Sequence, residues 1–277
     1  FLFVDKDSTY AYFHKALSLA SEKDNIENRL FALEYLLYTN GYYFDLEGYK
    51  QNLTLFKNLI SKVDANKTAS AVDVEYYLIQ YLMNEGNYHY MSKNLIDSKK
   101  SFLALNKILE AYPLGEMDAV MLDTKATVFN YLANIHKHQR HLKTASEYYR
   151  QEMNIYRQNS NLIENWEKSY HNSQKLLAMV YREEGDYKAA AALLEKATDF
   201  YKTKYEANYK NAMLTSYMEL SQNLLLQDKI NQALEVLDKV NKYLLLDDPF
   251  RPRQQTLRAD IYTKAGDYSQ ALATYDT

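Results

Sequence analysis

Three histidines lie close together in the chain, at His136, His138 and His141. Imidazole nitrogens are frequent zinc ligands, so this cluster is a candidate metal site. Spacings of two and five residues do not place all three rings on one face of a helix. The polar segment that contains them, residues 137–141, is typical of a turn between two helices. We therefore expect solvated histidines here, and no metal or other cofactor.

Paired carboxylates are the next groups that could do chemistry, as the acid and base of a hydrolytic site. The pairs Glu183-Glu184 and Asp247-Asp248 are sequence neighbours, and we interpret them as ordinary charges at helix ends. The chain has no glycine-rich phosphate loop, no zinc-protease motif and no nucleophile elbow. Because it also has no cysteine, a thiol nucleophile and a thiolate metal site are excluded. We expect no catalytic site.

Tyrosine accounts for 28 of the 277 residues. Clusters of tyrosine could line a groove for a carbohydrate or a peptide. Alternatively, the rings fill seams between helices while their hydroxyl groups reach water, and we favour this interpretation. The clusters are Tyr42-Tyr43-Phe44 and Tyr76-Tyr77, followed by Tyr81, Tyr88 and Tyr90.

The elements that must position these side chains are helices. With 6 glycines and 3 prolines, the chain lacks the residues that tight hairpins and β-sandwiches require. Hydrophobic residues make up 47% of the chain, which is enough for a core. The 33 basic and 36 acidic residues give a net charge of −3, so we expect no direct binding to nucleic-acid phosphates. No stretch is long and apolar enough to span a membrane, and the cellular compartment and oligomeric state stay open.

Internal repeats organise these helices. The motif Gly-Asp-Tyr begins at Gly185 and again at Gly266, 81 residues later, which indicates two units of about 40 residues. Each unit is predicted to be helix, turn, helix, with the glycine as a left-handed cap. Small residues recur where the paired helices must approach closely. They are Ala133, Ala178 and Ala259 on first helices, and Ala145, Ala190, Ala233 and Ala271 on second helices.

The region 25–112 keeps the helical rhythm without this signature. We predict one hairpin from residues 26–40 and 46–63, and another from residues 71–83 and 94–111, with a break at Pro113-Leu114-Gly115. Residues 8–20 and 271–277 are each predicted to be part of a second helix. We therefore expect both ends of the chain to fall within a repeat, and the functional protein to continue on at least one side.

These features resemble the tetratricopeptide repeat. The resemblance is strong from about residue 126 to 277 and weaker before, and the units are longer than the family's usual 34 residues. It implies a right-handed α-solenoid, or superhelix, of about six helical hairpins. We expect one continuous array over residues 1–277, with degenerate repeats in 1–115 and clearer repeats in 116–277.

The resemblance also implies a binding surface, because first helices line the concave face of such arrays. Positions 2, 5, 9 and 12 of each first helix would face the groove. Asn130 and Asn134 would be exposed there and hold the main chain of a peptide, while Lys175 and Arg182 would attract a carboxylate. The residues expected to bind the peptide are Thr127, Asn130, Asn134, Lys137, Asn172, Lys175, Met179, Arg182, Met218 and Gln222.

The function that we predict is recognition of a peptide or protein partner, as a scaffold or sensor module of a larger signalling protein. Two contexts are left open. The array resembles those that precede caspase-like CHAT protease domains, and equally the sensor arrays of bacterial histidine kinases or DNA-binding regulators. A stand-alone enzyme or carbohydrate-binding module is the remaining alternative.

Overall fold

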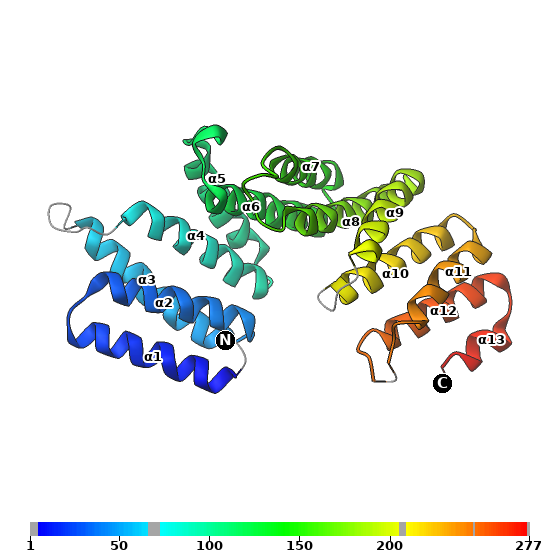
Figure 1. The fold of residues 1–277 in the computed structure, drawn as a ribbon, viewed down its shortest axis with the longest axis horizontal. Coiled ribbons are helices and arrows are strands. Elements are labelled where there is room, and N and C mark those ends of the chain that lie inside the picture. The colour runs from blue at the N-terminus through cyan, green and yellow to red at the C-terminus, as the bar shows by residue number, and fades with distance from the viewer. Residues whose placement is uncertain (1–4, 66–72, 205–208, 246, 276–277) are drawn as a thin grey trace. The chain divides into compact units, whose positions relative to one another are not determined.

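The computed structural model describes residues 5–65, 73–204, 209–245 and 247–275. Within these ranges the regular elements are thirteen α-helices and one short 3-10 helix, and there is no strand. The prediction of an all-α repeat fold is confirmed (Figure 1). The helices are α1 (Lys6–Glu22), α2 (Ile26–Tyr42), α3 (Leu46–Ala65), α4 (Val74–Met91), α5 (Leu95–Glu110), α6 (Ala119–His138), α7 (Leu142–Gln158), α8 (Trp166–Glu184), α9 (Tyr187–Thr203), α10 (Lys210–Leu226), α11 (Ile230–Asn241), α12 (Arg251–Ala265) and α13 (Tyr268–Ala273); the 3-10 helix η1 is Leu114–Glu116.

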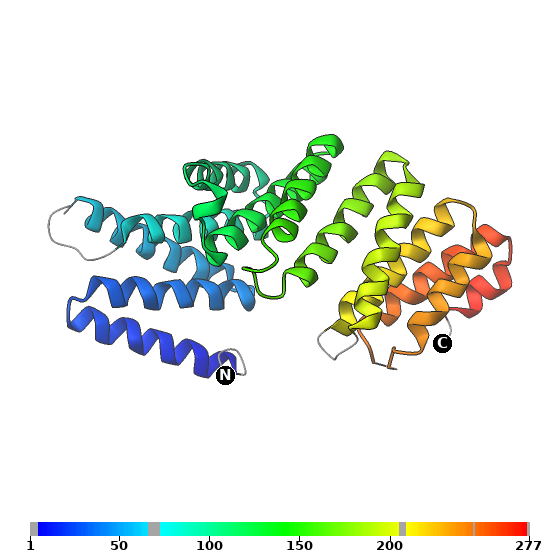
Figure 2. The ribbon, with the colours of Figure 1, turned by 45° about the horizontal axis from the view of Figure 1, so that its top comes forward.

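Six antiparallel pairs make up most of the described chain: α2–α3, α4–α5, α6–α7, α8–α9, α10–α11 and α12–α13 (Figures 1 and 2). The predicted pair from 26–40 and 46–63 corresponds to α2 and α3. The predicted helix 71–83 corresponds to α4, but that helix ends at Met91; residues 71–72 lie outside the described residues. The helix continues through Gly86, where a side chain would collide with the Phe102 ring of α5 at 2.7 Å.

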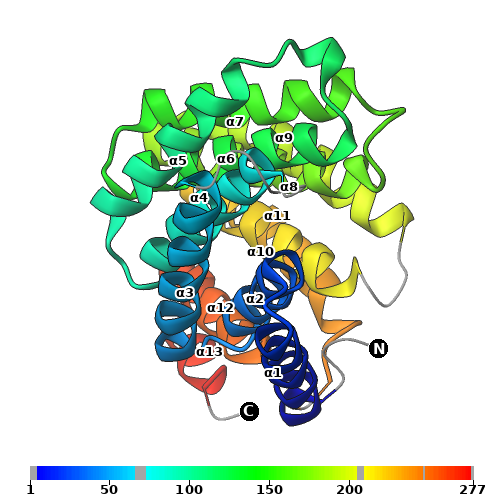
Figure 3. The same cartoon turned by 90° about the vertical axis from the view of Figure 1, so that its left-hand side faces the viewer.

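The chain divides into two compact units, residues 1–117 with α1–α5 and residues 118–277 with α6–α13. In the first unit, α2 packs against both α1 and α3 (Figure 3), and its core includes Leu30, Leu33 and Phe56. In the second unit, the α8–α12 core includes Leu214 and Leu237. Each core is made from apolar stripes that recur along the facing helices.

One turn geometry joins the two helices of every pair. Its central residue has a positive φ, which is 85° at Gly185 and 78° at Gly266, so the predicted glycine caps are confirmed. The next residue donates its backbone N–H to a carbonyl five residues earlier, as from Asp186 to Tyr181 at 2.9 Å. This is the Schellman end of a helix. Non-glycine residues hold the same position elsewhere, namely Phe44, Lys93, Arg140 and Asp228, and Asp24 between α1 and α2.

Small buried residues face each other in most of the pairs. Ala178 and Ala190 are both 0% exposed, and they are twelve residues apart with the turn residue Gly185 between them. The same spacing relates the predicted alanines of α6–α7 and α12–α13, which are also buried. The other pairs with this spacing are Ser221 with Ala233, joined by a hydroxyl-to-carbonyl hydrogen bond of 2.8 Å, and Gly86 with Ser98, joined in the opposite direction at 2.9 Å.

Candidate functional site

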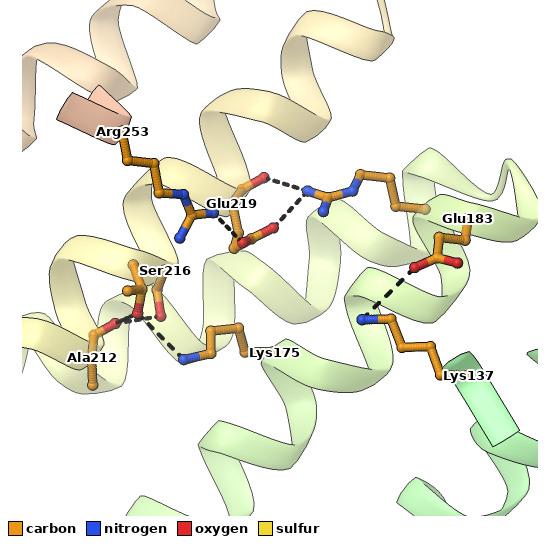
Figure 4. A network of polar contacts seen from close by, with 9 residues as sticks. Lys137, Lys175, Glu183, Ala212, Ser216, Glu219 and Arg253 are labelled. Carbon is orange, nitrogen blue, oxygen red and sulfur yellow. Dashed lines mark hydrogen bonds and ion pairs between the residues drawn. The ribbon is translucent and has the colours of Figure 1, made fainter. Parts of the chain in front are cut away.

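The first helices of the second unit carry a series of polar side chains that link one pair to the next. We call this series the first-helix face. It comes from α6, α8, α10 and α12, and neighbouring first helices in the series α8, α10, α12 contact one another directly. Its members are Lys137, Lys175, Arg182, Thr215, Glu219 and Arg253, of which Figure 4 labels Lys137, Lys175, Glu219 and Arg253.

Glu219 is the centre of the first-helix face. Its side chain is only 6% exposed and is held by two guanidinium groups, Arg182 from α8 at 2.7 Å and Arg253 from α12. Burial alone would raise the pKa of the Glu219 carboxyl, but the two arginines outweigh burial and hold this pKa below its usual value. An ionised carboxylate therefore joins three consecutive first helices (Figure 4).

Lys175 is the cation of this face without a carboxylate partner. Its Nζ donates a hydrogen bond of 3.3 Å to the Thr215 hydroxyl of α10, and no carboxylate in the described part of the chain lies within ion-pair distance. Burial lowers the pKa of its ammonium group, with the positive charge of Arg253 adding to this and Glu219 opposing it. Because an ammonium group has three N–H donors, two remain for another acceptor.

Lys137 lies at the end of α6 and contacts α8. Its Nζ is 3.7 Å from Glu183, and Arg140 in the following turn pairs with the same carboxylate. Glu183 thus neutralises part of the charge of these two cations. Counted over Lys175, Arg182, Glu219 and Arg253, the rest of the first-helix face keeps an excess of positive charge.

The expectation that Asn130 and Asn134 are exposed is wrong. Both are half-buried, and their amides are used inside the protein. Asn134 donates to the Asn130 side-chain oxygen at 2.9 Å and accepts from the Tyr149 hydroxyl at 2.9 Å. Asn130 donates to both carboxyl oxygens of Glu152 at 3.0 Å. The physical reason is that a buried carboxyl needs donors, which Asn130 supplies, while Asn134 donates to the Asn130 side chain.

Glu152 belongs to the second helix α7 and is 3% exposed. Burial raises the pKa of its carboxyl to about 8, a nearby negative charge at Asp123 adds to the rise, and hydrogen bonds from Ser173 and Asn130 oppose it. It lies seven residues after Ala145, on the same buried stripe as Tyr149 and Tyr156. This acid is therefore part of the interior of the second unit.

Other members of the expected set lie where a surface could use them. Thr127, Asn172, Met179 and Gln222 are half-buried on first helices. Met218 is a correction, because it is 0% exposed and belongs to the core. Helix α10 is apolar on most of its circumference, so Met218 turns inward and Glu219, one residue later, occupies the face.

Sequence reasoning missed Glu219, Arg253 and Glu152. For Glu219 a signal exists, since it is the single charged residue between Lys210 and Asp228, and an isolated carboxylate in an apolar helix requires a partner. Glu152 has a similar signal in its spacing from Ala145. Arg253 has none, because its partner lies 34 residues away in sequence.

The histidine cluster divides between a helix end and a turn. The expectation of solvated histidines is wrong for His136, because α6 continues to His138 and the His136 ring is buried against Tyr148 of α7. His138 and His141 are exposed, as expected, and His141 precedes α7. Within the described ranges no group of three potential ligands could hold a metal ion, and no helix is long and apolar enough to cross a membrane.

Known proteins share this architecture. Residues 176–203, which cover most of the α8–α9 pair, match the tetratricopeptide repeat family model. No curated protein matches the chain.

Several solved structures are similar. The apo form of RapI is 13% identical, with a TM-score of 0.73 over 98% of this chain and 70% of its own. A signal-transduction ATPase (STAND) protein with a tetratricopeptide repeat sensor, from Pyrococcus horikoshii, is 18% identical, with a TM-score of 0.71 over 98% of this chain and 40% of its own. NprR in complex with its cognate peptide NprX is 14% identical, with a TM-score of 0.63 over 99% and 73%.

These likenesses concern the fold, and the repeat match places one pair of helices in the family by sequence. Together with six helical pairs, recurrent left-handed turns and facing alanines, they show that the chain has a tetratricopeptide-like helical repeat fold in which the α8–α9 pair also matches the repeat family by sequence.

Proposed function

We propose that this chain is a peptide-binding sensor module, and that the first-helix face of its second unit holds an anionic group of an extended peptide. The observation that carries the proposal is Lys175, a half-buried ammonium group whose only side-chain partner in the described part of the chain is a hydroxyl. A charge in this position gains more from a carboxylate than from water, because the surroundings are partly desolvated.

The neighbouring charges favour the same ligand. Arg182 and Arg253 share the single carboxylate of Glu219. With Lys175, this part of the first-helix face therefore has three cations and one anion. A guanidinium group has five N–H donors, and each arginine keeps donors beyond those given to Glu219. A terminal carboxylate or an acidic side chain would complete the charge balance of this cluster.

The similar structures support a peptide as the carrier of that carboxylate. NprR, which has a similar fold, was solved in complex with its cognate peptide. The STAND protein has a tetratricopeptide repeat sensor. By analogy of fold alone, we propose that this chain also binds a peptide and reports it to another part of a signalling protein, without catalysing a reaction itself.

The amides Asn130 and Asn134 have a different part in this proposal from the one expected. Since they already bond to each other, to Glu152 and to Tyr149, they set the position of α6 against α7. Main-chain contacts to a peptide would come from half-buried residues such as Asn172 and Gln222, whose side chains make no hydrogen bond within the described residues.

The test uses a pool of random hexapeptides with free carboxyl termini and a matched pool with amidated termini. Charge-assisted hydrogen bonds contribute about 1.5–3 kcal/mol, so Lys175→Gln should weaken binding of the best carboxylate peptides by roughly ten- to a hundredfold. The measurement is fluorescence anisotropy of labelled peptides. Lys188→Gln, which changes an exposed lysine of α9, is the control and should bind like the parent.

A parent protein that binds both pools equally, and that binds amidated peptides with and without an acidic side chain equally, would contradict the proposal. So would a Lys175→Gln variant that folds like the parent, by its melting curve, and binds with unchanged affinity. In either case the ligand would not be anchored by its carboxylate at this face.

A further inference from the structure

A second candidate site lies in the first unit, between α2 and α4. A cavity of about 260 Å³ is lined by Glu34, Tyr35 and Tyr38 from α2 and by Gln80 and Asn84 from α4. These are the first helices of their pairs, and they contact each other directly. None of these lining residues is basic.

Glu34 gives the cavity its charge. Its carboxyl accepts one hydrogen bond, of 3.0 Å, from the Tyr76 hydroxyl. No lysine, arginine or histidine in the described ranges lies within ion-pair distance of Glu34. Burial raises the pKa of this carboxyl, and the hydrogen bond from Tyr76 opposes the rise only in part. A cation placed beside it would stabilise the charged form.

Aromatic rings form the walls. Tyr38 is 62% exposed, and Tyr35 is held in place by stacking on Phe13, with ring centroids 5.0 Å apart. The face of an aromatic ring carries partial negative charge and attracts cations. The cavity therefore presents a carboxylate and the rings of two tyrosines to whatever enters it.

Gln80 adds a neutral polar group. Its side-chain amide makes no hydrogen bond within the described residues. The Asn84 amide donates to the backbone carbonyl of Gln80 and accepts from the Tyr49 hydroxyl. An amide with a free oxygen at the cavity wall accepts an N–H group. Its presence favours a ligand with several donors over a simple point charge.

The charge of the whole first unit agrees with a basic ligand. Residues 1–117 contain 15 acidic and 12 basic residues, whereas residues 118–277 contain 21 of each. The net negative charge of the chain thus belongs to the first unit. A surplus of one sign raises the local concentration of oppositely charged ligands.

We propose that this cavity binds the side chain of an arginine from a peptide. The volume is below the roughly 300–1,000 Å³ of cavities for drug-sized ligands, and suits a single long side chain. A planar guanidinium group can donate to Glu34 and Gln80 while stacking on Tyr38, which an ammonium group cannot do as well. Arginine is therefore preferred over lysine.

The test titrates the protein with four acetylated and amidated pentapeptides that have a central arginine, lysine, glutamine or glutamate between alanines. Binding is followed by NMR through the side-chain amide signals of Gln80. We expect the arginine peptide to bind at least about tenfold more tightly than the glutamine peptide, as charge-assisted hydrogen bonds and a cation–π contact are lost together. The glutamate peptide should bind most weakly.

Three variants locate the effect. Glu34→Gln keeps an oxygen for Tyr76 but removes the charge, and should abolish the preference for arginine over glutamine. Tyr38→Leu should weaken the arginine peptide about threefold or more, and Tyr38→Phe should bind like the parent. Glu22→Gln, at an exposed position of α1, is the control and should change nothing. Lys175→Gln should also leave this binding intact, which separates this proposal from the one for the second unit.

Equal binding of the arginine and glutamine peptides would overturn the proposal, as would an unchanged preference in a folded Glu34→Gln variant. Agmatine, which carries a guanidinium group without a peptide, should bind at least about tenfold more weakly than the arginine peptide if main-chain contacts contribute hydrogen bonds. Equal binding of agmatine would show that a guanidinium group suffices without a main chain and would overturn the assignment to a peptide.

Discussion

The pairs α2–α3 and α8–α9 have the same turn but different seams. Phe44 and Gly185 both adopt a positive φ, and both turns close with a backbone hydrogen bond of 2.9 Å to a carbonyl five residues back. The α8–α9 pair has an alanine seven residues before the turn residue, Ala178, and another five residues after it, Ala190. At the same positions α2–α3 has Leu37 and Tyr49, which are also buried. The backbone of the turn is therefore preserved while the residues at the seam change.

The surfaces differ in the same way. First helices of the first unit carry exposed rings and Glu34, whereas those of the second unit carry Lys175 and two arginines around Glu219. The backbone of the helical pair determines the position of each side chain on the first helix. The residue type at that position determines its charge, which differs between the two units. The following experiments test how far the two units differ, beginning with the largest expected effect.

Leu37→Ala should destabilise the first unit by about 2–5 kcal/mol, because it leaves a cavity at a position that α8–α9 fills with alanine. Urea unfolding followed by far-UV circular dichroism measures the loss. The exposed Leu55→Ala of α3 is the control, with an effect within about 0.5 kcal/mol. A loss below about 1 kcal/mol for Leu37→Ala would mean that the α2–α3 seam can close as the alanine seams do.

Ala190→Leu makes the reverse change in the second unit. The added side chain has no space against Ala178, so we expect a loss of about 1–3 kcal/mol from overpacking. Fluorescence of Trp166, the single tryptophan of the chain, reports the unfolding of this unit. Ala192→Leu alters an exposed position of the same helix and should melt with the parent. If both variants melt alike, the small residue at 190 is not needed for packing.

Glu152 should make the second unit less stable as pH rises. Its pKa is about 8 in the folded chain against 4.5 for a glutamate free of such surroundings, so the folded form binds the proton more tightly. The stabilising effect is fully present below about pH 4.5 and is lost as pH rises through 8. Its slope is at most about 1.4 kcal/mol per pH unit.

The measurement for Glu152 is unfolding by urea between pH 5 and pH 8, followed through Trp166. Glu152→Gln keeps an oxygen to accept from Asn130 and removes the titration, so its stability should depend less on pH than that of the parent. Parallel pH profiles for parent and variant would show that this carboxyl does not control the slope.

The smallest effects concern the turns. Gly185→Ala places a side chain at φ 85° where no other atom interferes, so only the backbone penalty applies, about 1 kcal/mol of lost stability. Lys93→Gly should gain stability by relief of the same penalty, less the extra freedom of glycine in the unfolded chain. Gly115→Ala, which has neither a positive φ nor a close neighbour, is the control. Thermal melts compare the three, and a neutral Gly185→Ala would contradict a shared turn geometry.

Much of the fold could be predicted from the sequence, because its signals are local. Glycine at 185 and 266, and alanines on both sides of the turn, depend on backbone geometry within about twenty residues. The α4–α5 pair has the same pattern of small residue, turn residue and small residue, but with other residue types, namely Gly86, Lys93 and Ser98. Sequence reasoning predicted this hairpin but missed its shared pattern of small and turn residues. Lysine seldom adopts a positive φ, and serine is not an obvious substitute for a buried alanine.

The candidate site was harder to predict from the sequence than the fold. Lys175 and Arg182 were expected on a binding face, but the contacts that define that face join residues 34 to 40 positions apart. In α10 the apolar residues surround most of the helix, so periodicity does not show whether Met218 or Glu219 points inward. The cavity at Glu34 depends on the separation of α2 and α4, for which the sequence contains no local signal.

The fixed turn also has a consequence for how the repeats of this chain differ in length from one another. Within a pair, the small residue, the turn residue and the second small residue keep positions 0, 7 and 12 from 86–98 through 259–271. From one turn to the next, however, the interval falls from 49 residues between Phe44 and Lys93 to 38 between Asp228 and Gly266. Insertions and deletions must therefore collect outside this segment, in the far ends of the helices and the connections between pairs. An alignment anchored at these three positions, with gaps allowed only elsewhere, should recover repeats that a search for fixed-length units misses.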